Sequence, residues 1–138
     1  KYYLHEHPLG AKSWQELEIR AMAQKEHNIL AKLDQCQYGL WVQDKQGWLL
    51  AKKPTLFLTK SLCIAQQLTR RCPGAHTHAD GKHASLFDGR SRQSQVHLEA
   101  LCGAICGRLS EHIEHDRKGQ FLFAELHMED PGYGKVGR

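Results

Sequence analysis

The order of strand-like and helix-like segments at the start of the chain restricts the fold more than any other feature. Residues 1–6, KYYLHE, are typical of a short strand that stops near Pro8. A helix is expected next, opened by a capping box of Ser13 and Glu16. Residues 29–33 then have the composition of a second strand. This order predicts a parallel pair of strands joined by a right-handed crossover, and hence an α/β fold with a mixed sheet flanked by helices.

The rest of the chain continues the alternation. Two short apolar runs around residues 44–47 predict a hairpin or a loop, and residues 55–59, TLFLT, predict a buried strand. Ser61 can cap a helix over residues 62–71. A longer helix is expected over about residues 92–115, where apolar residues recur at helical spacing.

The chain is long enough for one hydrophobic core. Its 138 residues are 41% hydrophobic and 25% charged, which is a globular composition. We therefore expect a single α/β domain over residues 1–120, which could be a fragment of a larger domain, and a strand-like segment with a mobile tail over residues 121–138. The 5 cysteines are odd in number and scattered, and neither a secretory apolar segment nor a transmembrane run is present in the sequence. These features predict an intracellular protein without a membrane partner.

Residues 71–83, RCPGAHTHADGKH, concentrate side chains that bind metals. Four of them are candidate zinc ligands: Cys72, His76, His78 and His83. Zinc would reduce the entropy of this loop and so stabilise it. Cys36, His5 or His7 could supply a ligand from a distance. The alternative is a solvated loop whose histidines point to water.

Two further groups of residues are candidates for chemistry. Glu6 lies at the end of the strand that opens the strand, helix, strand unit, where open α/β sheets bind ligands, and its carboxylate could bind a base or act as a general acid. The alternative is a polar strand end. Cys102 and Cys106 share one helical face, and we expect them to be buried as small apolar residues.

The formal charge of +4 is compatible with a polyanionic partner without requiring one. Basic residues gather at three places in the sequence, and they are candidate contacts to nucleic acid: Lys52, Lys53, Arg70, Arg71, Arg90 and Arg92. Trp41, Trp48 and Phe87 are the nearest aromatic residues, so a surface that holds phosphates and stacks a base is one interpretation. The alternative is a set of solvated charges at the ends of elements.

Five stretches in order, HEHPLGAKSW, LDQCQYGL, KKPTLFLTKS, RRCPGAHTH and VHLEALCGAICGRL, carry a family resemblance. Over residues 2 to about 113, the chain resembles the later half of a cytosine-5 DNA methyltransferase-like domain, of the divergent type found in mobile elements and phage-like genes. The resemblance implies a class I, Rossmann-like methyltransferase fold. It also gives Glu6 a catalytic role, in which its carboxyl group binds N3 of a flipped cytosine.

In that family, the glycine-rich cofactor loop and the Pro-Cys nucleophile lie upstream of the glutamate strand. The resemblance therefore implies a nucleic-acid-associated domain that is inactive alone and that uses S-adenosylmethionine only when an upstream half is present. Two other functions stay open. One is a small zinc-stapled domain that binds nucleic acid or protein, and the other is a structural subunit that pairs with a second copy through an exposed sheet edge.

Overall fold

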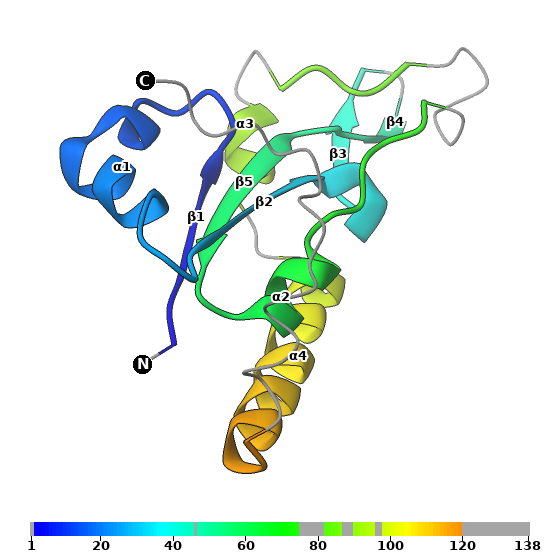
Figure 1. The fold of residues 1–138 in the computed structure, drawn as a ribbon. Helices are drawn as coiled ribbons and strands as arrows, with labels where there is room; N and C mark the ends of the chain where they lie inside the picture. The colour runs from blue at the N-terminus through cyan, green and yellow to red at the C-terminus, as the bar shows by residue number, and fades with distance from the viewer. Residues whose placement is uncertain (1, 46, 75–81, 87–89, 96–97, 120–138) are drawn as a thin grey trace.

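The computed structural model describes residues 2–45, 47–74, 82–86, 90–95 and 98–119. The segment expected to form a strand-like tail, residues 121–138, lies outside the described residues. The described part is a mixed α/β structure with two small antiparallel sheets and flanking helices (Figure 1). The α/β class expected from the sequence is thereby confirmed. Within this part of the chain, no helix combines the length and apolarity needed to cross a membrane.

The main sheet has three strands in the order β1 (Leu4–Pro8), β5 (Pro54–Thr59) and β2 (Ile29–Asp34). Both outer strands pair antiparallel with β5, so that Glu6 lies opposite Phe57 and Ala31 also lies opposite Phe57. The predicted parallel pairing of the first two strands is wrong. Strand β5 arrives from later in the chain and takes the position between them.

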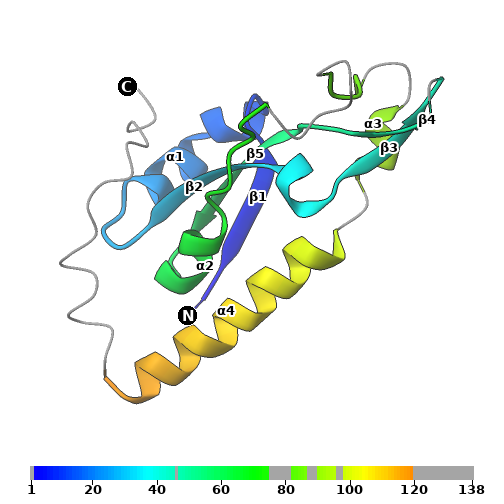
Figure 2. The same ribbon diagram turned by 90° about the vertical axis from the view of Figure 1, so that its right-hand side faces the viewer.

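Strand β5 is buried on both faces because its side chains alternate between two layers. Leu56 and Leu58 face a cluster that includes Trp14 of the 3-10 turn η1 (Lys12–Gln15) and apolar residues of α1 (Leu17–Ala23). Phe57 faces the opposite way, into a cluster with residues of α2 (Leu62–Gln67) and α4 (Glu99–Arg117). The sheet is therefore a middle layer between α1 and the α2–α4 pair (Figure 1, Figure 2).

The first helix begins later than the sequence predicts, and the expected capping box is absent from the described residues. Ser13 lies in η1 and its Oγ bonds Nδ1 of His7 at 3.1 Å, while Glu16 has an extended backbone at ψ 137°. The indole of Trp14 donates to the carbonyl of Pro8 at 3.0 Å and is 5% exposed. This anchored ring holds η1 against the sheet, so that α1 starts only at Leu17.

The helix predicted after Ser61 is confirmed at its start, but it ends at Gln67 and not at residue 71, so α2 is shorter than expected. The Ser61 hydroxyl accepts from the backbone N–H of Ile64 at 3.3 Å and caps α2. The same hydroxyl lies 2.8 Å from Nδ1 of His112, a buried side chain of α4. Ser61 therefore caps the N-terminus of α2 and also links this helix to α4 through His112.

The long helix predicted over residues 92–115 is instead two helices, α3 (Arg90–Gln93) and α4. The side chain of Gln93 exchanges two hydrogen bonds with the backbone of Gln43, and Lys53 Nζ donates to the carbonyl of Ser94 at 2.6 Å. These contacts fix α3 against the hairpin and away from the axis of α4. Cys102 and Cys106 are exposed on α4, so the prediction that they are buried is wrong.

The predicted hairpin is confirmed as β3 (Trp41–Asp44) and β4 (Gly47–Leu50). Its inner face is apolar, since Val42 and Leu49 pack in a cluster with Ala84 and residues that flank the hairpin. The backbone N–H of Ala84 donates to the carbonyl of Leu50 at 2.8 Å, so residues 82–86 run along the outer edge of β4. The hairpin is held on its other edge by α3.

Candidate metal centre

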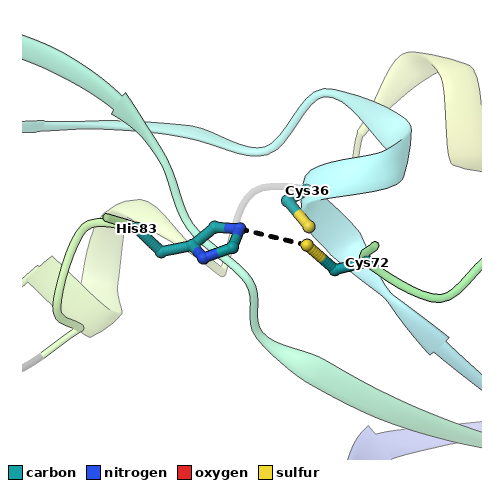
Figure 3. Close-up of side chains that lie close together, drawn as sticks. All are labelled: Cys36, Cys72 and His83. Atoms are coloured by element: carbon teal, nitrogen blue, oxygen red, sulfur yellow. Dashed lines mark hydrogen bonds between the residues drawn. The ribbon is translucent and has the colours of Figure 1, made fainter. Parts of the chain in front are cut away.

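Three side chains from separate segments converge on one point: Cys36, Cys72 and His83 (Figure 3). Cys36 lies in the 3-10 turn η2 (Gln35–Tyr38), which follows β2 directly. Cys72 comes after α2, and His83 belongs to the segment along the edge of β4. Their ligand atoms all lie within 4.8 Å of one another, with Cys36 buried and the other two half-buried. The three could hold a metal ion.

The spacing fits a tetrahedral ion. Cys72 Sγ lies 3.5 Å from Nε2 of His83. For zinc, bond lengths of about 2.3 Å to sulfur and about 2.0 Å to nitrogen place two such ligands ~3.6 Å apart. Thiolate and imidazole are also the ligand types that favour zinc over magnesium or calcium. The distance and the ligand types are therefore compatible with zinc.

Hydrogen bonds hold the backbone around Cys72 in place. The N–H of Gly74 points at Cys72 Sγ with a separation of 3.3 Å. Asp34, which is 1% exposed, accepts from the N–H of Cys72 at 2.8 Å and from Nε of Arg71 at 3.0 Å. The N–H of Asp34 in turn donates to the carbonyl of Arg70 at 3.0 Å. The end of β2 thereby holds the chain that carries Cys72.

Burial raises the pKa of Cys36 to about 12, and the hydrogen bond with the neighbouring Cys72 adds to the effect. Without a cation, Cys36 is therefore a protonated thiol. A bound divalent ion would reverse this preference, because a coordinating thiol loses its proton to the metal. Metal binding at this centre must release protons.

The sequence predicted part of this centre. The structure brings Cys72 and His83 together, as expected, while His76 and His78 lie outside the described residues. Cys36 was one of three distant candidates. The other two, His5 and His7, stack on one another beside Trp14, on β1. Spacing along the chain could not choose among the three, because only the turn after β2 brings Cys36 to the loop.

Glu6 does not reach the metal centre. It lines a cavity of about 190 Å³ between the sheet and the first turns of α4, together with Gln35, Lys53 and Phe57. Lys53 is half-buried there, and burial lowers its pKa while Glu6 opposes that effect. Glu6, the candidate carboxylate predicted from the sequence, therefore faces a small cavity whose polar lining includes Gln35 and Lys53.

The six predicted basic contacts are not equivalent. The guanidinium of Arg70 lies 5.4 Å from the ring centroid of Tyr38, and Arg71 pairs with Asp34. Lys53 is committed to Ser94, as described above. Lys52 and Arg92 are exposed, and the side chain of Arg90 lies outside what the structure describes. Half of the predicted set therefore has a structural role.

Comparison with protein families, with curated proteins and with solved structures finds no match to this chain.

Proposed function

We propose that this domain is a zinc-stapled module that binds nucleic acid, in which Cys36, Cys72 and His83 hold one zinc ion. One observation carries the proposal: two sulfurs and an imidazole nitrogen from three separate segments meet within 4.8 Å. The ion would tie the turn after β2, the exit of α2 and the edge of the hairpin together. Its role is structural, and the fourth ligand is predicted to come from His76 or His78 of the same loop.

The partner class is supported by charge. Residues 40–53, 82–86 and 90–95, which form or flank the hairpin, contain six Lys or Arg and one acidic residue, Asp44. Their formal charge of +5 exceeds the +4 of the whole chain. The zinc ion would tie these basic segments to the rest of the fold, since His83 belongs to residues 82–86 while Cys36 and Cys72 lie outside the three segments. Phosphates are the natural counterparts of such basic segments.

The test is the metal content of the purified full chain, measured by elemental analysis. We expect about one zinc per chain, and its loss in Cys36→Ser and in Cys72→Ser. Cys102→Ser is the matched control, because Cys102 is exposed on α4 and is not a member of the cluster. Zinc retained in both cluster variants, or no zinc in the unmodified chain after zinc is supplied, would contradict the proposal.

A second candidate function is that of a methyltransferase-like domain, as the family resemblance implies. Its Rossmann-like fold would be completed by an upstream half. It is favoured by the position of Glu6 in a cavity of about 190 Å³. An empty protein cavity of roughly 150 Å³ accepts benzene, so one pyrimidine ring would fit. Cytidine should then shift NMR signals of cavity residues such as Gln35, and Glu6→Gln should abolish the shift while the exposed Glu18→Gln leaves it. Unshifted signals would count against this candidate, and S-adenosylmethionine is expected to bind only with the upstream half.

Pairing of a second copy through the edge of β1 or β2 also stays a prediction, which the mass in solution would test.

A further inference from the structure

The outer face of the β3–β4 hairpin exposes two tryptophans. Trp41 is 50% exposed and Trp48 is 62% exposed, whereas the third tryptophan of the chain, Trp14, is buried. In the hairpin register, Trp41 lies opposite Leu50 and Trp48 lies opposite Gln43. Because cross-strand partners and alternate residues share a face, both indoles project from the side opposite the buried Val42.

The two indoles are close enough to act together. They are diagonal neighbours across the two strands, a relation that places the backbone positions roughly 7 Å apart and within reach of aromatic side chains. A tryptophan typically buries 150–250 Å² in a folded protein, so this pair leaves on the order of 200 Å² of aromatic surface in water. On the inner face of the same hairpin, Val42 is buried and Leu49 is partly buried, so that the two most exposed aromatic side chains lie on one side.

Three exposed cations lie in or beside the hairpin that carries this aromatic face. Lys45 is exposed at the end of β3, Lys52 is exposed just beyond β4, and Arg92 is exposed on α3, which is bonded to β3 through Gln93. Asp44 is the one acidic residue in the sequence of the hairpin and its two flanking segments. An apolar protein partner would not interact favourably with these positive charges. A polyanion with aromatic groups could bind both the cations and the tryptophans.

We propose that Trp41 and Trp48 form a stacking platform for unpaired bases of a single-stranded nucleic acid, whose phosphates contact Lys45, Lys52 and Arg92. The inference deepens the proposed function and rests on its nucleic-acid part. Duplex bases are already stacked on each other and offer no free ring face, while bases of a single strand stack on exposed aromatic side chains. Stacking on an aromatic ring discriminates poorly among bases, so binding is expected to be largely independent of sequence.

The experiment measures binding of the zinc-supplied full chain to a labelled single-stranded oligothymidylate of about a dozen nucleotides, a length within the range of single-strand sites. Fluorescence anisotropy gives the affinity, and quenching of intrinsic tryptophan emission reports contact with the platform. A DNA duplex of equal length and vesicles of phosphatidylserine and phosphatidylcholine are the competing ligands. Circular dichroism confirms that each variant is folded.

Trp41→Ala and Trp48→Ala should each weaken binding about 5- to 100-fold, the usual effect of removing one stacked base contact. Trp48→Phe should retain most of the affinity, because a ring face remains. Leu17→Ala is the matched control, since Leu17 is a 77% exposed apolar residue on α1. Lys52→Ala should weaken binding and reduce the salt dependence by about one ion, whereas the tryptophan variants should leave the salt dependence unchanged.

The outcomes separate the two proposals. Equal affinity of the tryptophan variants and the unmodified chain, or equal affinity for duplex and single strand, overturns the platform while nucleic-acid binding stands. Binding to the vesicles with none to either nucleic acid overturns both. A chain that binds no nucleic acid yet contains zinc loses the nucleic-acid part of the proposed function, and the platform with it.

Discussion

Replacing Asp34 by asparagine tests whether the buried carboxylate organises the metal centre. Asp34 Oδ2 accepts from the N–H of Cys72 and from Arg71, and Oδ1 is buried without a hydrogen-bond partner among the described residues. In Asp34→Asn, the amide oxygen can take the place of Oδ2. The NH₂ group then occupies the buried position of Oδ1, which makes no hydrogen bond within that part of the chain.

The magnitude follows from these contacts. A hydrogen bond to a charged group contributes about 1 kcal/mol more than a neutral one, and the share from Arg71 is reduced because its side chain is 39% exposed. A buried NH₂ without an acceptor costs about 1–3 kcal/mol. We expect the free energy of unfolding to fall by roughly 2–4 kcal/mol, which for a chain of this size lowers Tm by about 10 °C.

Two measurements distinguish the mechanism from simple destabilisation. Urea unfolding of the chelator-treated protein gives the stability change without the metal, and competition with a zinc indicator gives the affinity. Loss of a residue that orients a ligand typically lowers metal affinity about 10- to 100-fold. Glu18→Gln, the equivalent change at an exposed position in the first turn of α1, should leave the zinc affinity unchanged and lower the stability by less than about 1 kcal/mol. The reasoning is refuted if Asp34→Asn behaves like Glu18→Gln in both measurements.

Three further changes have expected outcomes. Gly39→Ala should lower the free energy of unfolding in urea by about 1 kcal/mol, because Gly39 ends η2 at φ 82°. An added Cβ meets only open space there, so the cost comes from the backbone alone. Gly10→Ala, with equal space and no positive φ, should cost less. Ser61→Ala should lower stability in thermal unfolding by at least the ~1 kcal/mol of a lost helix cap. In chelator-treated protein at pH 8, iodoacetamide should modify the exposed Cys102 much faster than Cys36. The reason is that a pKa of about 12 leaves roughly one Cys36 side chain in ten thousand as thiolate. Equal rates by mass spectrometry would contradict the burial of Cys36.

The features that were predictable from the sequence are local ones. The apolar run TLFLT can lie only in a strand covered on both faces, and Ser61 lies at a helix start because its side chain bonds three residues ahead. The order of the strands was not predictable, since nothing near Leu4–Pro8 or Ile29–Asp34 records that β5 will separate them. The strand, helix, strand pattern favours a parallel pair only when the two strands become neighbours.

The same distinction between local and distant information applies to the metal centre. Cys72 and His83 belong to one loop and were visible as a group, but Cys36 lies 36 residues before Cys72 and shares no spacing pattern with it. One signal could have selected Cys36. It lies two residues after Asp34, a charged residue at the end of a buried strand, where a carboxylate requires hydrogen-bond donors or a cation. Those partners come from the segment of Cys72.

The place of β5 in the sheet has a consequence for how the chain folds as it is synthesised. The middle strand is the last of the three to leave the ribosome, so β1 and β2 both emerge with open edges and no neighbour to pair with. Once residue 59 is free, β2 should pair with β5 first, because the loop between them is shorter than the one that separates β5 from β1. Strand β1, although the first of the three to be made, should therefore be the last of the sheet to dock, and until then its open edge can pair with another molecule.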